Sequence, residues 1–197
     1  MFFIVAILLS IAYVSLVEWL LHRFVMHQPL LGFSYPFEAH AKKHHRIFRA
    51  DDSYHLKRDE DKYTIPMKWW NGPVLIFATT LTVVPIGWLI GRWSVVAIVG
   101  IVCAAYYGAY EYLHWCMHLP RKRLVERSGI FFRLNGHHLL HHRYMNRNFN
   151  VVLPLADLFL GTLLLRSKVR FAQAVGPSLP NVQPLTTQCR GAQTPVT

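Results

Sequence analysis

Residues 1–21, MFFIVAILLSIAYVSLVEWLL, are mostly apolar with Glu18 as their only charge, and this stretch decides the fold class. A helix of about 20 apolar residues crosses the hydrocarbon core of a bilayer, which is about 30 Å thick. A cleaved signal peptide is the competing interpretation, but no basic region precedes the stretch and no small-residue cleavage site follows it. We therefore predict a retained membrane span over residues 1–21.

Two more apolar stretches, residues 71–91 and 94–113, predict further spans, and Pro85 and Gly87 are expected to kink the first of them. The chain of 197 residues is 53% hydrophobic and only 16% charged, which excludes an ordinary soluble domain with about a quarter charged residues. Its three cysteines exclude a disulfide-rich scaffold. The sequence thus predicts an all-α integral membrane protein with about three transmembrane helices.

The remaining segments predict one domain and a tail. Residues 151–165 are too short to span a bilayer, and we expect a helical segment there, lying at the interface or packed under the site. Residues 49–62 lack apolar periodicity and are expected to form a solvated loop. Residues 1–172 then form a membrane-embedded domain, and residues 173–197, rich in Pro, Gln and Thr, are predicted to be disordered.

The charge distribution predicts the orientation of the spans. The chain has 21 Lys and Arg against 10 Asp and Glu, and the basic residues gather in residues 28–70 and 119–150, between apolar stretches. That placement is typical of cytoplasmic loops of a membrane protein, so we expect no nucleic-acid partner. The prediction is a multi-pass protein of the endoplasmic reticulum or the bacterial inner membrane, with its N-terminus outside and its histidine-rich loops in the cytoplasm.

Histidine carries the chemistry, because eleven of twelve histidines fall in four groups. The groups are His22 and His27; His40, His44 and His45; His114 and His118; and His137, His138, His141 and His142. Positions three or four apart share a helix face. We therefore expect side chains to point toward a common site within three sets: His40 with His44, His114 with His118, and His138 with His141 and His142.

His22 and His27 are five residues apart, about 140° around a regular α-helix. They suit two neighbouring metals, or a helix that breaks near Met26. Imidazole favours Fe, Cu, Ni or Zn, and two ions with four or five histidines each would use the set. His55 stands alone and is expected to be an ordinary interfacial residue.

Other metal proteins fit the pattern less well. The sequence has no HExxH motif for a zinc protease. Bis-histidine haem needs ligands that face each other inside the spans, and a metal transporter needs polar ligands at mid-membrane depth. These histidines instead lie at or beyond the ends of the predicted spans.

The four groups, taken in order, resemble the histidine boxes of the fatty acid hydroxylase superfamily of membrane di-iron oxygenases, which includes sterol desaturases. The boxes are His22-Arg-Phe-Val-Met-His27, His40-Ala-Lys-Lys-His44-His45, His114-Trp-Cys-Met-His118 and His137-His138-Leu-Leu-His141-His142. The sequence from Asn148 to Thr162 is similar to the stretch that follows the last box. It departs at Asn150, where the family often has Gly, and at Ala156, where it often has Trp.

This resemblance implies an oxidoreductase with two Fe ions, which Zn replaces readily in purified protein. The implied ligands are His22, His27, His40, His44, His45, His114, His118, His138, His141 and His142, with His137 supernumerary. The implied reaction is hydroxylation or desaturation of a lipid, such as a fatty acyl chain or a sterol, with O₂. Because the sequence has no flavin, haem or dinucleotide motif, electrons are expected from a cytochrome b5-like or ferredoxin-like partner.

Three carboxylates are candidates to orient the ligands from outside the metal shell. Glu18 lies four residues before His22, and Glu111 lies three residues before His114, so each is expected to accept the second N–H of a neighbouring histidine. Asp157 is a weaker candidate for the same role. Tyr106, Tyr107 and Tyr110 are expected to pack the third span rather than contact substrate.

Two alternatives stay open at this point. A non-enzymatic membrane protein could use the histidines to bind zinc or copper. Within the enzyme interpretation, carotenoid hydroxylases share the first box, although their third box usually has four residues between its histidines rather than the three found here. The sequence does not decide the substrate, the reaction outcome, the electron donor or the oligomeric state.

Overall fold

The computed structural model describes residues 1–30 and 32–165, so the predicted disordered tail of residues 173–197 lies outside the described residues. Over the described ranges the chain is helical, and its only strand-like feature is a single bridge between Leu30 and Phe33. The all-α prediction is confirmed for this part of the chain.

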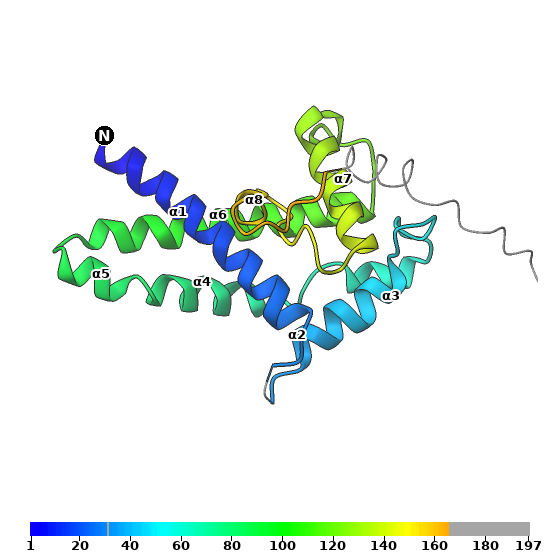
Figure 1. The fold of residues 1–197 in the computed structure, drawn as a ribbon, viewed down its shortest axis with the longest axis horizontal. Helices are drawn as coiled ribbons and strands as arrows, with labels where there is room; N and C mark the ends of the chain where they lie inside the picture. The colour runs from blue at the N-terminus through cyan, green and yellow to red at the C-terminus, as the bar shows by residue number, and fades with distance from the viewer. Residues whose placement is uncertain (31, 166–197) are drawn as a thin grey trace, which may run out of the picture.

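Three long helical units form the body of the molecule. They are α1 (Phe2–Leu21), which continues into the π-helix η1 (His22–Met26); the pair α4 (Asn71–Leu81) and α5 (Val84–Leu89); and α6 (Trp93–His118). The α4–α5 pair runs antiparallel to α6, and α1 crosses both at an angle (Figure 1). Each unit is long and apolar enough to cross a membrane, as predicted.

Two of these units differ from the predicted spans. The second is broken at residues 82–83, because Pro85 has no N–H to donate to the carbonyl of Leu81 and the chain turns there through a bond from Val83 N to Thr80 O. The third reaches His118 rather than residue 113. At about 1.5 Å per residue, its 26 residues extend about 39 Å, so its last turn passes the length of a bilayer core.

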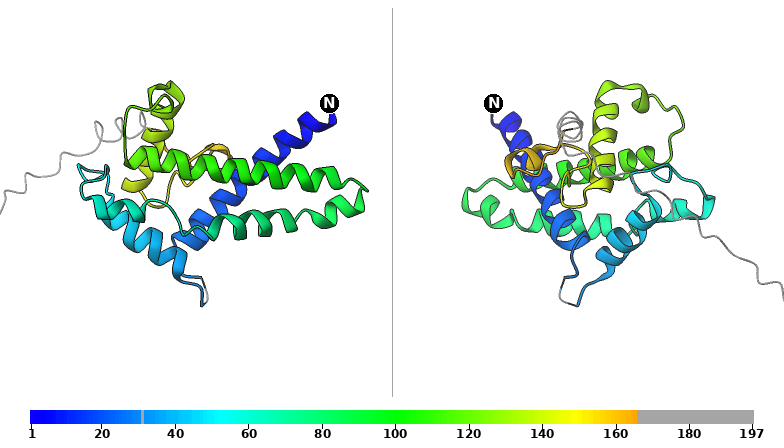
Figure 2. Two further views of the ribbon diagram at one scale, coloured as in Figure 1. Left: turned by 180° about the vertical axis from the view of Figure 1, so that it is seen from behind. Right: turned by 45° about the vertical axis from the view of Figure 1, so that its right-hand side comes forward.

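The short elements gather at one end of the long helices. They are α2 (Tyr35–Phe37), η2 (Glu38–His44), α3 (His45–Ile47), η3 (Asp59–Thr64), η4 (Val125–Arg127) and α7 (Gly129–Arg143). Figures 1 and 2 place them beside the C-terminal ends of α1 and α6, while the N-terminus and the α5–α6 turn lie at the opposite end. Both basic loops predicted from the sequence therefore lie at the same end of the molecule.

The predicted helical segment over residues 151–165 is mostly non-helical. Only α8 (Leu155–Phe159) is helical, because Pro154 precedes it and Gly161, with a φ of +70°, ends it. The segment packs against α1 through bonds from Ser15 Oγ to the carbonyl of Leu153 (2.9 Å) and from Trp19 Nε1 to Thr162 Oγ1 (2.8 Å). This matches the expectation of packing under the site.

The loop over residues 49–62 is not simply solvated, as the sequence suggested. Tyr54 is buried in its middle, packs against Cys116 and Met117 of α6, and donates its hydroxyl to Asn135 Oδ1 of α7 (2.8 Å). Most charged residues of the loop stay exposed, but Asp61 is buried and accepts from Arg58, so the loop is anchored by Tyr54 and by this carboxylate. That placement brings the loop carbonyls to the histidines.

Candidate metal centre

Ten histidines converge at this end of the bundle as two adjoining groups of five. Group one is His22, His27, His40, His45 and His141. Group two is His44, His114, His118, His138 and His142. Within each group, one ring nitrogen from every histidine lies within 4.8 Å of the others. The two groups contain the ten histidines that the sequence analysis singled out as ligands.

Two π-helical turns sort the histidines between the groups. In η1 the amide of His27 donates to the carbonyl of His22 (3.1 Å), five residues back, and this wider turn brings both side chains to one face. In η2 the same five-residue bond joins His45 to His40. His22 and His27 therefore share group one, and the predicted helix break near Met26 takes the form of a π-turn.

Some predicted pairings within a helix are wrong, for a different reason in each case. His40 shares its group with His45 rather than His44, because η2 is wound more loosely than an α-helix. On the regular helix α7, His138 aims with His142, whereas His141 points into group one. The pairing of His114 with His118 is confirmed, as expected for positions four apart on α6.

The Nε2 atoms of each group face a common point. In group one the Nε2 contacts run from His22 to His40 (2.8 Å), from His40 to His45 (3.1 Å), from His45 to His141 (3.1 Å) and from His141 to His27 (3.1 Å). In group two they are His44 to His114 (3.2 Å), His118 to His138 (3.2 Å) and His138 to His142 (3.0 Å). Two nitrogens about 2.1 Å from one ion and 90° apart would lie about 3.0 Å from each other.

Main-chain carbonyls fix which ring nitrogen faces inward. In group two, the Nδ1–H groups of His44, His118 and His142 donate to the carbonyls of Thr64 (3.2 Å), Tyr54 (2.8 Å) and Phe48 (2.6 Å). In group one, His141 donates to Arg147 O (2.8 Å) and His22 donates to Phe149 O. A carbonyl only accepts, so Nδ1 carries the hydrogen and Nε2 presents a lone pair.

These contacts test whether the residues fit a metal. In group two, His118 and His142 both turn an Nε2 lone pair toward His138, whereas in group one His22 faces His40 and His141 faces His45 and His27. A single imidazole hydrogen on His138 cannot satisfy both lone pairs that face it, whereas a cation at the centre of a group would accept all the lone pairs turned toward it. The donor set is all imidazole and fits a first-row transition metal.

Two of the carboxylates expected to orient the ligands hold other groups. Glu18 accepts from Tyr106 OH (2.7 Å), Asn150 Nδ2 (2.8 Å) and Val151 N (2.7 Å). Glu111 accepts from Tyr107 OH (2.7 Å) and the amide of Met67 (3.4 Å). None of these partners is a histidine, so both carboxylates connect spans and loops rather than hold a histidine ring.

Asp157 and the two histidines outside the groups, His137 and His55, are the remaining residues that the sequence analysis discussed. Asp157 accepts from His137 Nε2 at 3.2 Å, but His137 belongs to neither group, as its supernumerary place in the last box implies. His55 is exposed and also lies outside both groups. Asp157 therefore contacts a histidine, but not one that faces either centre.

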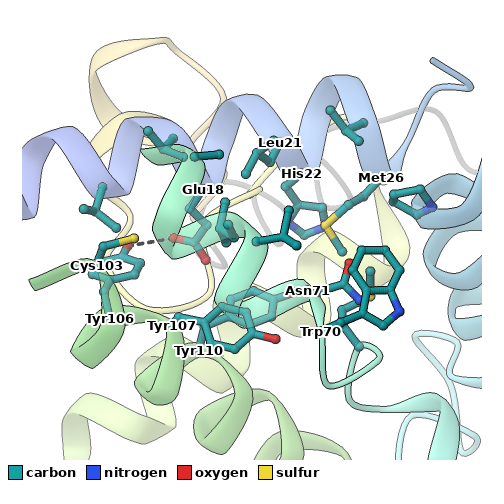
Figure 3. Close-up of a pocket in the computed structure, with 18 of the residues that line it drawn as sticks. Glu18, Leu21, His22, Met26, Trp70, Asn71, Cys103, Tyr106, Tyr107 and Tyr110 are labelled. Atoms are coloured by element: carbon teal, nitrogen blue, oxygen red, sulfur yellow. Dashed lines mark hydrogen bonds between the residues drawn. The ribbon is translucent and has the colours of Figure 1, made fainter. Parts of the chain in front are cut away.

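An apolar cavity of about 260 Å³ leads from the middle of the long helices to His22 (Figure 3). Its walls come from α1, α4 and α6, with Val14, Val74 and Ala78 among the aliphatic residues. Tyr106, Tyr107 and Tyr110 also line it, so these tyrosines do more than pack the third span (Figure 3). The cavity can accept an extended hydrocarbon chain with one end beside group one.

A second pocket reaches the centre from the side of the polar loops. It is lined by Lys43 and Lys68 at the surface and by His40, His44 and His114 inside. Met67 and Tyr110 line both spaces and therefore stand between them. The histidines are thus reached from an apolar side and from a polar side.

Burial keeps the ligand imidazoles neutral. It lowers the pKa of His27 and His44 to about 3, and that of His141 to about 4, from an ordinary 6.5. A neutral imidazole binds metal and a protonated one does not, so lower pKa values weaken proton competition. We expect metal content to stay constant from about pH 7.5 to about pH 5.5, measured by metal analysis after dialysis. An exposed hexahistidine peptide is the control, and loss of half the metal near pH 6.5 would contradict this expectation.

The fold and site define a class: a helical chain with three possible membrane spans and a buried centre of ten histidines that could hold metal ions. No family model, curated protein or solved structure matches this chain. Function must therefore be argued from the site itself.

Proposed function

We propose that the protein is a multi-pass membrane oxidoreductase that uses O₂ to hydroxylate or desaturate an unactivated C–H position of a lipid. The observation that carries this proposal is the apolar cavity that ends at His22, against a centre of ten imidazoles of which nine are buried. Two iron ions held by the two groups would supply O₂ activation. Each group would hold its ion through five imidazoles.

The residues of this chain would bind and orient the lipid and shield the metal centre from water. The cavity walls on α1, α4 and α6 hold the hydrocarbon chain, and Tyr110, whose ring centroid lies 5.6 Å from that of His114, bounds it near the histidines. Group two is deeply buried, with His118 and His138 both 0% exposed. Exclusion of water protects the reduced centre from side reactions and leaves the lipid as the accessible target.

Electron delivery in this proposal falls to a partner. Exposed Lys42, Lys43, Arg46 and Arg49 lie on η2, on α3 and just beyond, beside the histidines of the second box. An acidic cytochrome b5-like or ferredoxin-like donor would complement this basic surface and dock close to the centre. The positive-inside rule then places this end in the cytoplasm of a cell with an endoplasmic reticulum, or of a bacterium, and the N-terminus outside.

A labelling experiment tests the proposed function. Cells that express the protein with ample iron are supplied with heavy-isotope O₂, and their lipids are compared with those of cells that express His118→Ala. We expect a hydroxylated lipid that carries the label, or a lipid that has lost two hydrogens, only with the wild-type chain. Unchanged lipids together with zinc as the only metal in cells would support the alternative of a zinc- or copper-binding protein.

A further inference from the structure

The two histidine groups take their orienting carbonyls from different segments of the chain. In group two the three carbonyls belong to Phe48, Tyr54 and Thr64, all in the loop between α3 and α4. In group one both carbonyls belong to Arg147 and Phe149, just after α7. Residues 147–164, here called the clasp, therefore serve group one, and their hydrogen bonds within the described residues reach no histidine of group two.

Asp157 fixes the peptide group that orients His22. The carbonyl of Phe149 and the N–H of Asn150 belong to one planar peptide unit and point in opposite directions. Asp157 Oδ2 accepts that N–H at 2.7 Å, so the carbonyl at the other side is held toward His22 Nδ1. Asp157 Oδ1 also accepts the amide of Phe149 at 2.9 Å, which holds the preceding peptide unit.

Both oxygens of the Asp157 carboxylate accept hydrogen bonds. Its remaining bonds come from Thr162 Oγ1 (2.6 Å) and His137 Nε2 (3.2 Å), and its side chain is 0% exposed. Burial raises the pKa of Asp157, but the hydrogen bonds from His137, Thr162, Asn150 and Phe149 outweigh it and hold the pKa below its usual range. The residue therefore stays an acceptor at both oxygens.

We propose that Asp157 is a positioning residue for group one alone, acting on His22 through the Phe149–Asn150 peptide. This inference rests on the metal centre of the proposed function. It means that the two metal positions are built independently and that one can be emptied while the other stays filled. Loss of a partner that orients a ligand histidine weakens metal affinity by on the order of 10–100-fold.

The test is a titration of the metal-free full chain in detergent with Zn²⁺, followed by metal analysis. We expect Asp157→Ala to bind half as much zinc as the wild type at concentrations that fill both wild-type groups. Asp157→Asn should fall between them, because its amide keeps one accepting oxygen and turns an NH₂ toward the N–H of Asn150. Asp59→Asn is the matched control: this exposed carboxylate bonds only Lys62 among its described contacts and should leave zinc content unchanged.

Double variants locate the effect. Asp157→Ala combined with His27→Ala, also in group one, should lose no more zinc than Asp157→Ala alone. Combined with His114→Ala of group two, it should lose nearly all zinc. Full zinc content in Asp157→Ala, or an additive loss with His27→Ala, would overturn the inference.

Folding is checked within the same experiment, because zinc retained in group two requires a folded centre. If Asp157→Ala loses both ions together with its thermal transition, the zinc content of Asp157→Asn decides: a content below that of the wild type with group two still filled supports the inference, and full content overturns it. A wild-type chain that holds two ions but oxidises no lipid would sink the proposed function and leave this inference standing. A wild-type chain that binds no zinc would overturn the metal centre and this inference together.

Discussion

Alanine in place of His141 is expected to halve the iron content of the protein, and alanine in place of His114 is expected to do the same. His141 belongs to group one and His114 to group two. Each substitution therefore leaves its own group with four imidazole donors instead of five. The double variant should hold almost no iron. Lipid oxidation should fall below detection in all three variants, because the proposed chemistry needs both ions together.

Metal analysis of protein expressed with ample iron and purified gently in detergent measures this prediction. His55→Ala is the control, because His55 is exposed and lies outside both groups, so its variant should keep full iron content and activity. Loss of all the metal in either single variant would mean that the groups form one indivisible site. Unchanged content in both would remove the histidines from the ligand set.

Tryptophan in place of Ala78 is expected to lower the rate of lipid oxidation by on the order of 10²-fold, with metal content unchanged. Ala78 lines the apolar cavity on α4, and an indole there takes the space of several methylene groups of a bound chain. The displaced substrate would present its carbon away from His22. The measurement is product formed per metal-loaded chain under saturating reductant.

Ala97→Trp provides the matched control for this substitution. Ala97 lies exposed on α6 and is absent from the cavity lining, so the same added volume faces outward there. The control should keep wild-type activity. Equal activity in Ala78→Trp and Ala97→Trp would mean that the substrate reaches the centre by another route, such as the pocket beside Lys43 and Lys68.

The helical spans were predictable because hydropathy and length are local properties of a sequence. The assignment of each histidine to one of the two groups was less predictable, because it depends on how tightly each helix is wound. The five-residue spacing of His22 and His27 did point away from a regular helix, and the same spacing recurs between His40 and His45. Read together, the two spacings are the signal that predicts a π-turn at each box.

The groups that orient the ligands were missed for a different reason. Sequence reasoning looks for side chains, and it selected Glu18 and Glu111 because they lie one turn from a ligand. The orienting groups are instead carbonyls, such as those of Tyr54 and Arg147, which every residue type carries. Only the buried Tyr54 within a polar loop, an aromatic among charged residues, hinted that residues 49–62 fold back onto the site.

Because carbonyls rather than side chains orient the histidines, the centre is insulated from many changes of residue type. At Thr64 or Arg147 a substitution alters the side chain and leaves the accepting oxygen in place, whereas at Phe48 the buried ring also packs against His44 and His118. What the centre does not tolerate is a change in chain length or backbone path within these loops, such as a single-residue deletion. Sequences that build the same centre are therefore free to diverge in composition there while keeping loop length fixed, which makes spacing a better guide to this architecture than residue identity.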